Sequence, residues 1–168
     1  MERQGTTKLD GTGAASANEQ LLTFIVDGEE YGVEILRVQE IRSWSIPMPI
    51  PNTPPFIKGV INIRGDVVAI ADLRERLGLP RLDYGATTVI VVLRVGRSGH
   101  ERVMGVIVDA MSDVTTVPQA AIKPPPVFKS SIEGSVTKGI VTLESKMITI
   151  LDVDRIFDVS GASLVPAA

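Results

Sequence analysis

The chain of 168 residues contains no cysteine and a single histidine. Without cysteine there is no disulfide, no thiolate nucleophile and no thiolate metal site, which fits a reducing cytoplasm. His100 lies between Gly99 and Glu101 in a short polar turn, where a metal ion would find too few ligands. No phosphate-binding glycine loop or nucleophile elbow occurs either. We therefore predict a protein without catalytic residues, metal or cofactor.

Basic and aromatic residues are also scarce, since the net charge is −3 and aromatic residues make up 4% of the chain. A nucleic-acid-binding surface needs clustered basic side chains for phosphates and aromatic platforms for bases. A small-barrel nucleic-acid-binding protein is thus an alternative that the composition disfavours. The longest apolar run, Val89 to Leu93, is far shorter than the ~20 residues that span a bilayer. We expect a cytoplasmic protein with no direct membrane insertion.

The sequence does contain an internal repeat. The stretch from Lys58 to Leu73 recurs without a gap as Lys138 to Val153, at an offset of 80 positions. Each copy predicts a β-hairpin, because two apolar, β-branched runs flank a short polar connection such as Arg64-Gly65-Asp66. A second echo, at an offset of 73, aligns Tyr31-Gly32-Val33 with Met104-Gly105-Val106. Repetition of one small β unit predicts a duplicated fold.

Other segments follow the same order in each half. Each half is expected to hold a hairpin, a third strand, a proline-rich crossover and, after the repeated hairpin, a short helix. In the first half these are Leu22 to Ile35, Val38 to Ile41, Ile46 to Pro55 and Asp72 to Gly78; in the second they are Thr88 to Asp109, Asp113 to Val117, Lys123 to Phe128 and Asp152 to Phe157.

These elements predict an all-β fold with two or three short helices, built as two small antiparallel barrels. We expect the first barrel at about residues 20–80 and the second at about 86–151, inside a folded domain of residues 20–159. The tails, 1–19 and 160–168, have no hydrophobic period and are expected to be flexible. Asp72 and Asp152 end paired strands, where an enzyme could place two carboxylates, but each also stands where a helix needs an N-cap.

Several motifs together resemble one known family. The motifs are Glu30-Tyr31-Gly32-Val33, Val38-Gln39-Glu40-Ile41, Asn52-Thr53-Pro54, Phe56-Ile57-Lys58-Gly59-Val60, Asn62-Ile63-Arg64-Gly65, Asp72-Leu73, Gly105-Val106-Ile107-Val108-Asp109 and Pro124-Pro125-Pro126. In their order and spacing, the chain from Gln20 to Phe157 is similar to the CheW family of bacterial chemotaxis coupling proteins. The resemblance implies two five-stranded, SH3-like β-barrels packed together, in agreement with the repeat.

The resemblance also implies a function. It predicts a non-enzymatic scaffold, or adaptor, of a two-component signal transduction system, which couples the cytoplasmic tips of methyl-accepting chemoreceptors to the CheA-type histidine kinase. Such a protein is cytoplasmic and recruited to membrane-associated receptor arrays. Ala69, Ala71 and Val136 depart from residues that the family often has. A coupling protein of a non-flagellar chemosensory pathway, controlling surface or pilus motility, is therefore an alternative.

Two sets of binding residues follow from the resemblance. The family binds receptors in a groove of the first barrel, and the kinase contacts mainly the second barrel. The positions that match the receptor groove here are Ile35, Val38, Glu40, Gly59 and Arg64. Those that match the kinase face are Gly105, Val106 and Val108.

Overall fold

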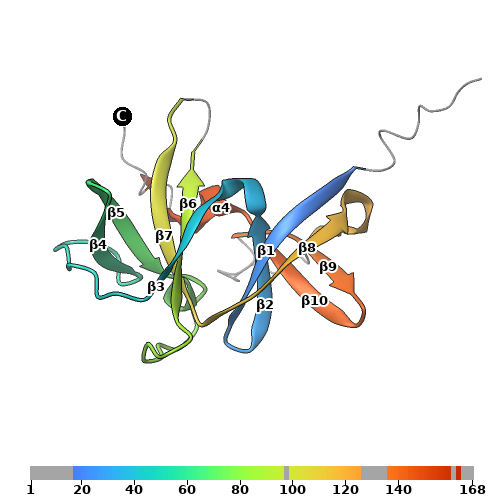
Figure 1. Cartoon of the computed structure of the whole chain (residues 1–168), viewed down its shortest axis with the longest axis horizontal. Helices are drawn as coiled ribbons and strands as arrows, with labels where there is room; N and C mark the ends of the chain where they lie inside the picture. The colour runs from blue at the N-terminus through green and yellow to red at the C-terminus, as the bar shows by residue number, and fades with distance from the viewer. Residues whose placement is uncertain (1–16, 97–98, 126–135, 160–161, 164–168) are drawn as a thin grey trace, which may run out of the picture.

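The computed structural model describes residues 17–96, 99–125, 136–159 and 162–163. They form two five-stranded sheets that lie side by side (Figure 1). Sheet 1 has the order β8-β1-β2-β10-β9 and sheet 2 the order β3-β6-β7-β5-β4. The predicted all-β class is confirmed. The predicted N-terminal tail ends slightly too late, because β1 already begins at Asn18.

The strand bounds follow the predicted segments closely. Sheet 1 consists of β1 (Asn18–Val26), β2 (Glu29–Glu34), β8 (Ala110–Pro118), β9 (Thr137–Leu143) and β10 (Lys146–Leu151). Sheet 2 consists of β3 (Val38–Ser43), β4 (Ile57–Ile63), β5 (Asp66–Asp72), β6 (Val89–Val95) and β7 (Arg102–Val108). The short elements are η1 (Ile35–Arg37), α2 (Leu73–Arg76), η2 (Gln119–Ala121), α4 (Val153–Ile156), β11 (Asp158–Val159) and β12 (Ala162–Ser163).

The sequence led us to expect one barrel before residues 80–86 and the other after them. The two sheets do not divide the chain there. The hairpin β1–β2 joins the sheet built mainly by the second half, and the hairpin β6–β7 joins the sheet built mainly by the first half. Parallel pairing makes both joins, with β2 beside β10 and β7 beside β5. The halves of the chain therefore exchange their first hairpins. A repeat in the sequence reveals the two copies but not which copy each strand pairs with.

Both repeat offsets appear in the strand register. Gly32 lies opposite Ile150 in sheet 1, and its echo Gly105 lies opposite Ile70, the repeat counterpart of Ile150, in sheet 2. A Cβ atom at Gly105 would lie 2.7 Å from Cδ1 of Ile70 and 2.9 Å from Cγ2 of Ile90. Glycine is needed at this point because the parallel join brings a bulky side chain over its backbone.

The largest hydrophobic cluster lies between the two sheets. It contains Phe24 and Val33 from sheet 1 together with Leu93 and Val106 from sheet 2, all 0% exposed. Each sheet also closes over a smaller cluster of its own. Because buried apolar surface stabilises at roughly 25 cal/mol per Å², the shared cluster makes the two barrels one folding unit.

The short helices begin at the two repeated aspartates. Oδ1 of Asp72 accepts a hydrogen bond of 2.9 Å from the backbone N–H of Arg74, and Oδ1 of Asp152 accepts one of 3.1 Å from that of Asp154. Asp72 also accepts a hydrogen bond of 2.7 Å from the hydroxyl of Tyr84. The capping interpretation is confirmed, and both side chains are used to hold the fold.

The first proline-rich crossover runs along β4 and is held by a backbone bridge. The N–H of Met48 donates to the carbonyl of Val60 at 2.8 Å, and the N–H of Val60 donates back at 2.9 Å. Gly59 precedes this bridge with a φ of 141°, and a Cβ atom there would lie 2.1 Å from the carbonyl oxygen of Met48. A side chain at this position would force the crossover away from the sheet.

We expect Gly59→Ala to lower the free energy of unfolding by at least about 2 kcal/mol, because it combines a positive φ with a backbone overlap. Gly85→Ala is the matched control, since a Cβ atom at Gly85 meets no heavy atom within 4 Å and its φ is not positive. It should stay within ~0.5 kcal/mol of the parent. Equilibrium denaturation followed by circular dichroism measures both. Equal stability of the two variants would show that the crossover does not need this glycine.

Candidate functional site

Two of the predicted receptor-binding residues form an ion pair on the surface of sheet 2. Arg64 lies at the tip of the β4–β5 hairpin with a φ of 51°, and its side chain is 70% exposed. Its Nη1 atom lies 2.6 Å from Oε2 of Glu40 on β3. This hydrogen bond and the charge of the guanidinium hold the pKa of Glu40 below its usual range. The sequence predicted both residues but not that they meet.

The turn is built so that Arg64 can reach β3. Gly65 also has a positive φ, and its N–H donates a hydrogen bond of 3.0 Å to Oδ1 of Asn62. Two consecutive positive φ values match the right-handed twist of a two-residue hairpin. The side chain of Arg42 adds a longer contact of 3.5 Å to Oε1 of Glu40. An ordered carboxylate and a mostly exposed guanidinium thus stand together, and the guanidinium has donors left for a partner.

The other predicted receptor residues have structural roles. Val38, on β3, is half-buried against the cluster between the sheets, as is Ile35 in η1. Gly59 is buried, and the approach of the crossover explains why it has no side chain. Ile35 also lines a groove of about 310 Å³ with its neighbour Leu36. The structure therefore brings Glu40 and Arg64 together as one exposed feature and leaves Gly59 beneath the surface.

The predicted kinase residues cannot make side-chain contacts with a partner. Val106 and Val108 are 0% and 1% exposed, and Gly105 is buried as well. All three lie on β7, which has β6 on one side and β5 on the other. They also belong to sheet 2, the sheet that carries Glu40 and Arg64. The sequence did not reveal this burial, because a strand rich in valine has the same pattern whether it lines a surface groove or a core.

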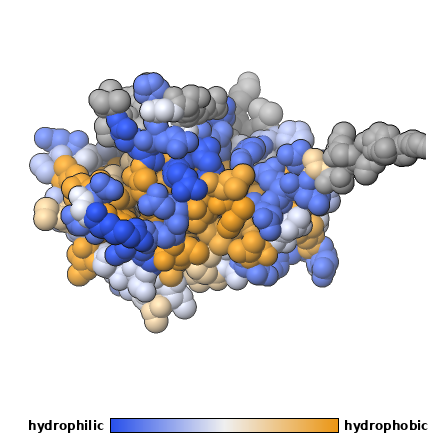
Figure 2. Space-filling view, turned by 45° about the horizontal axis from the view of Figure 1, so that its top comes forward, coloured by the Kyte–Doolittle hydropathy of each residue, from blue (hydrophilic) through white to orange (hydrophobic). Residues whose placement is uncertain are grey.

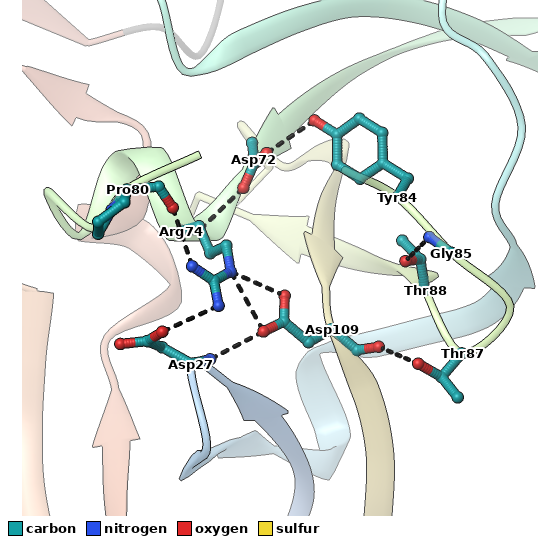
Figure 3. A network of polar contacts seen from close by, with 9 residues as sticks. All are labelled: Asp27, Asp72, Arg74, Pro80, Tyr84, Gly85, Thr87, Thr88 and Asp109. Carbon is teal, nitrogen blue, oxygen red and sulfur yellow. Dashed lines mark hydrogen bonds and ion pairs between the residues drawn. The ribbon is translucent and has the colours of Figure 1, made fainter. Parts of the chain in front are cut away.

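A polar network between the sheets escaped the sequence analysis (Figure 3). Arg74 on α2 is 10% exposed at its side chain, and its Nε atom lies 3.2 Å from both carboxylate oxygens of Asp109. Its Nη2 atom lies 2.9 Å from Oδ1 of Asp27, in the β1–β2 turn of sheet 1, and its Nη1 donates to the carbonyl of Pro80 at 2.8 Å. The backbone N–H of Asp27 closes the ring by donating to Asp109 at 2.8 Å. Arg74 thus connects the two sheets.

The second half carries a counterpart of this network with the charges reversed. Asp154, the repeat counterpart of Arg74, forms an ion pair with Arg37 in η1. It also accepts a hydrogen bond of 2.8 Å from the N–H of Gly96, in the β6–β7 turn. Each short helix is therefore held to the exchanged hairpin of its own half. This pairing could not be predicted from the sequence, because Arg74 and Asp109 lie 35 positions apart and Arg37 and Asp154 lie 117 apart.

Several large apolar side chains are exposed. Ile46 and Met48 in the first crossover are 85% and 70% exposed, and Leu36 in η1 is 79% exposed. Ile41, next to Glu40 on β3, is 44% exposed. Figure 2 shows apolar side chains gathered over the middle of one face, with polar residues around them. Exposed apolar surface next to ordered charges is typical of a protein-binding surface.

Comparisons with known proteins agree with this arrangement. The sequence model described as the CheW-like domain matches residues 20–160. The chain belongs to the CheW-like domain family. It is 36% identical to the chemotaxis protein CheW of Klebsiella aerogenes over 150 residues, which cover 89% of this chain and 88% of that protein. It is 37% identical to CheW of Rhizobium meliloti over 142 residues, which cover 84% and 89%.

A solved CheW structure shares the fold. The crystal structure of the scaffolding protein TtCheW from Thermoanaerobacter tengcongensis aligns with a TM-score of 0.80 and 29% identity, over 89% of this chain and 99% of the other. Residues 20–160, which the family model matches, include the Arg64–Glu40 pair and the network around Arg74. Within the described residues, no helix is long and apolar enough to cross a membrane.

We expect Arg64→Ala to raise the pKa of Glu40 toward its ordinary value, because the variant removes the main hydrogen bond that lowers it. Arg42→Ala should raise it less, since the contact of Arg42 is longer. A pH titration of the Glu40 carboxyl carbon by nuclear magnetic resonance gives both values. A pKa that stays unchanged in Arg64→Ala would mean that the ion pair does not persist in solution.

We expect Arg74→Met to lower the free energy of unfolding by about 1–3 kcal/mol, because it leaves the carboxylates of Asp27 and Asp109 without their charged donor. Arg81→Met, at an exposed arginine outside this network, is the matched control and should stay within ~0.5 kcal/mol of the parent. Urea denaturation at neutral pH compares them. Equal unfolding midpoints would contradict a stabilising role for the network.

Proposed function

We propose that this protein is a chemotaxis scaffold that couples the cytoplasmic tips of chemoreceptors to a CheA-type histidine kinase. Family membership supports the coupling role, because the relatives are chemotaxis proteins and the structural neighbour is a scaffolding protein. An adaptor needs stable surfaces for two partners and no reaction chemistry. On this proposal it acts in the cytoplasm, at membrane-associated receptor arrays.

The Arg64–Glu40 pair is the observation that carries the receptor side of the proposal. An exposed ion pair adds little to stability, typically 0–1 kcal/mol, so its contribution to the fold does not account for so ordered a feature. The guanidinium offers a planar fork of donors for carboxylates or helix-end carbonyls on a receptor tip. Glu40 lies opposite Val92, whereas Val38 and Ile41 lie opposite Leu93 and Val91, so these two apolar side chains point to the other face of β3.

The kinase requires a surface other than β7. We assign it to exposed apolar residues outside the β3 and hairpin-tip region, of which Leu36 is 79% exposed beside the groove that Ile35 lines. This assignment moves Ile35 from the receptor surface to the kinase surface and gives the kinase residues other than Glu40 and Arg64. The matches to chemotaxis proteins do not favour the alternatives of a non-flagellar pathway or a nucleic-acid-binding barrel.

We expect Arg64→Ala to abolish most receptor-dependent kinase activation while the free energy of unfolding stays within ~0.5 kcal/mol of the parent. Arg64→Lys should restore only part of the coupling, because an ammonium cannot form the same fork. The assay reconstitutes receptor signalling domains, kinase and each variant, and measures kinase autophosphorylation and co-sedimentation.

Exchanging the charges of Arg64 and Glu40 tests whether Arg64 contacts the receptor or only positions the hairpin. If Arg64 touches the receptor, the double variant Arg64→Glu with Glu40→Arg remains uncoupled although the ion pair is restored. If the pair only positions the hairpin, the double variant recovers coupling, and the contact role of Arg64 is wrong. Full coupling by Arg64→Ala would remove the receptor site from this surface altogether.

A further inference from the structure

A pocket of about 320 Å³ opens on sheet 1 beside the tip of the β9–β10 hairpin. Three carboxylates line it, from Glu30 on β2, Asp113 on β8 and Glu144 at the hairpin tip, together with the ammonium group of Lys146. We call it the acidic pocket. In Figure 1 this hairpin lies on the opposite side of the molecule from β4 and β5. None of the residues assigned to receptor or kinase above lines the pocket.

The repeat gives the pocket residues counterparts in sheet 2. Glu144 corresponds to Arg64 at the offset of 80, and Asp113 corresponds to Glu40 at the offset of 73. The strand register confirms the second match independently. Met111 lies opposite Phe24 and Val114 opposite Leu22 in sheet 1, while Val38 lies opposite Leu93 and Ile41 opposite Val91 in sheet 2. Phe24 and Leu93 are themselves paired with the equivalent residues Tyr31 and Met104.

In sheet 2 this position is closed by an ion pair, whereas in sheet 1 it stays open. Arg64 reaches Glu40 at 2.6 Å. In sheet 1 the acid remains as Asp113, but the arginine is replaced by Glu144, and two like charges do not bridge. Within the described residues, neither Asp113 nor Glu144 has an ionic partner. The pocket in sheet 1 therefore lies at the position that corresponds to the guanidinium of Arg64 in sheet 2.

Lys146, the cation among the described residues that line the pocket, already pairs with Glu30. Nζ of Lys146 lies 3.3 Å from Oε1 of Glu30, whose side chain is 9% exposed, and the hydroxyl of Ser112 donates to Oε2 at 2.9 Å. Burial raises the pKa of Glu30, but hydrogen bonds from Thr23, Ser112 and Lys146 outweigh burial and lower it. Glu30 is thus charged and neutralised by Lys146, so the carboxylates of Asp113 and Glu144 define the charge that the pocket offers to a ligand.

We propose that the acidic pocket binds an arginine side chain presented by a protein partner. The Arg64–Glu40 pair shows, within the same chain, that the acid at this strand position binds a guanidinium. Two carboxylates, one from Asp113 on β8 and one from Glu144 at the hairpin tip, suit the planar fork of arginine. The volume lies at the low end of ligand pockets, as expected for one side chain. Thr115 and Leu143, which also line the pocket, give a partner further surface to contact.

The test titrates Nα-acetyl-arginine amide into the ¹⁵N-labelled full chain and follows backbone amide shifts by nuclear magnetic resonance. Nα-acetyl-citrulline amide, which has nearly the same shape without the charge, is the control ligand. We expect saturable shifts at Asp113, Thr115 and Glu144 with the arginine amide, and at least about tenfold weaker binding of the citrulline amide. Equal binding of the two ligands, or shifts that do not saturate, would overturn the proposal.

Charge variants locate the binding. In Glu144→Arg the introduced guanidinium fills the position itself, so the saturable shifts should disappear. Glu101→Arg makes the same change of net charge on an exposed turn of sheet 2 and should keep them. If Glu144→Arg does not fold, Glu144→Gln combined with Asp113→Asn removes the carboxylates at nearly constant shape and should weaken binding by at least about tenfold. Undiminished binding in the folded variant contradicts the assigned site.

The source of the arginine is tested with the same labelled chain. Free L-arginine has a free α-amino and α-carboxyl group, which an arginine within a protein lacks. We expect free L-arginine to bind no more tightly than the capped amide. At least about tenfold tighter binding of the free amino acid would mean that the pocket recognises a metabolite, and the protein-borne source would be wrong.

Discussion

The structure depends on the exchange of the two N-terminal hairpins between the halves of the chain. The exchanged hairpins β1–β2 and β6–β7 supply Phe24, Val33, Leu93 and Val106 to the hydrophobic cluster between the sheets. If each half kept its own hairpin, these apolar faces would have to find other partners. The parallel joins at Gly32 and Gly105 permit the exchange, and the polar networks around Arg74 and Asp154 tie each hairpin turn to the helix of its own half. One interlocked unit results.

The duplicated frame carries different chemistry in its two copies. The helix contact is Arg74 to Asp109 in one copy and Asp154 to Arg37 in the other. The hairpin tip is Arg64 in one and Glu144 in the other. The frame accommodates either sign because the hairpin tip is exposed and each helix charge lies against an opposite charge. Because equivalent positions of the two copies carry opposite charges, one duplicated fold presents two different surfaces.

Features that depend on local sequence patterns, such as the strands and the two short helices, could be predicted. Features that depend on pairing between distant segments were missed. Alternating apolar runs, turn glycines and the aspartate caps identified the strands and the two short helices, and the motif match identified Glu40 and Arg64. The exchange of hairpins was missed because the repeat does not show which copy each strand pairs with. Val106 and Val108 were placed on a surface by resemblance alone, and Arg74 was not singled out because Asp27 and Asp109 lie far from it in the sequence. The second proline-rich crossover was predicted through Phe128, of which residues 126–128 lie outside the described residues.

Hydrogen exchange in the assembled complex tests the central claim that receptor and kinase occupy separate faces of one rigid unit. The labelled chain is compared alone, with a receptor signalling domain, and with receptor and kinase together. The account predicts that the receptor alone slows exchange at β3 and at the tip around Arg64, and that the kinase adds protection elsewhere, including η1. Receptor protection confined to sheet 1, or kinase protection that coincides with receptor protection at β3 and the hairpin tip, would contradict it.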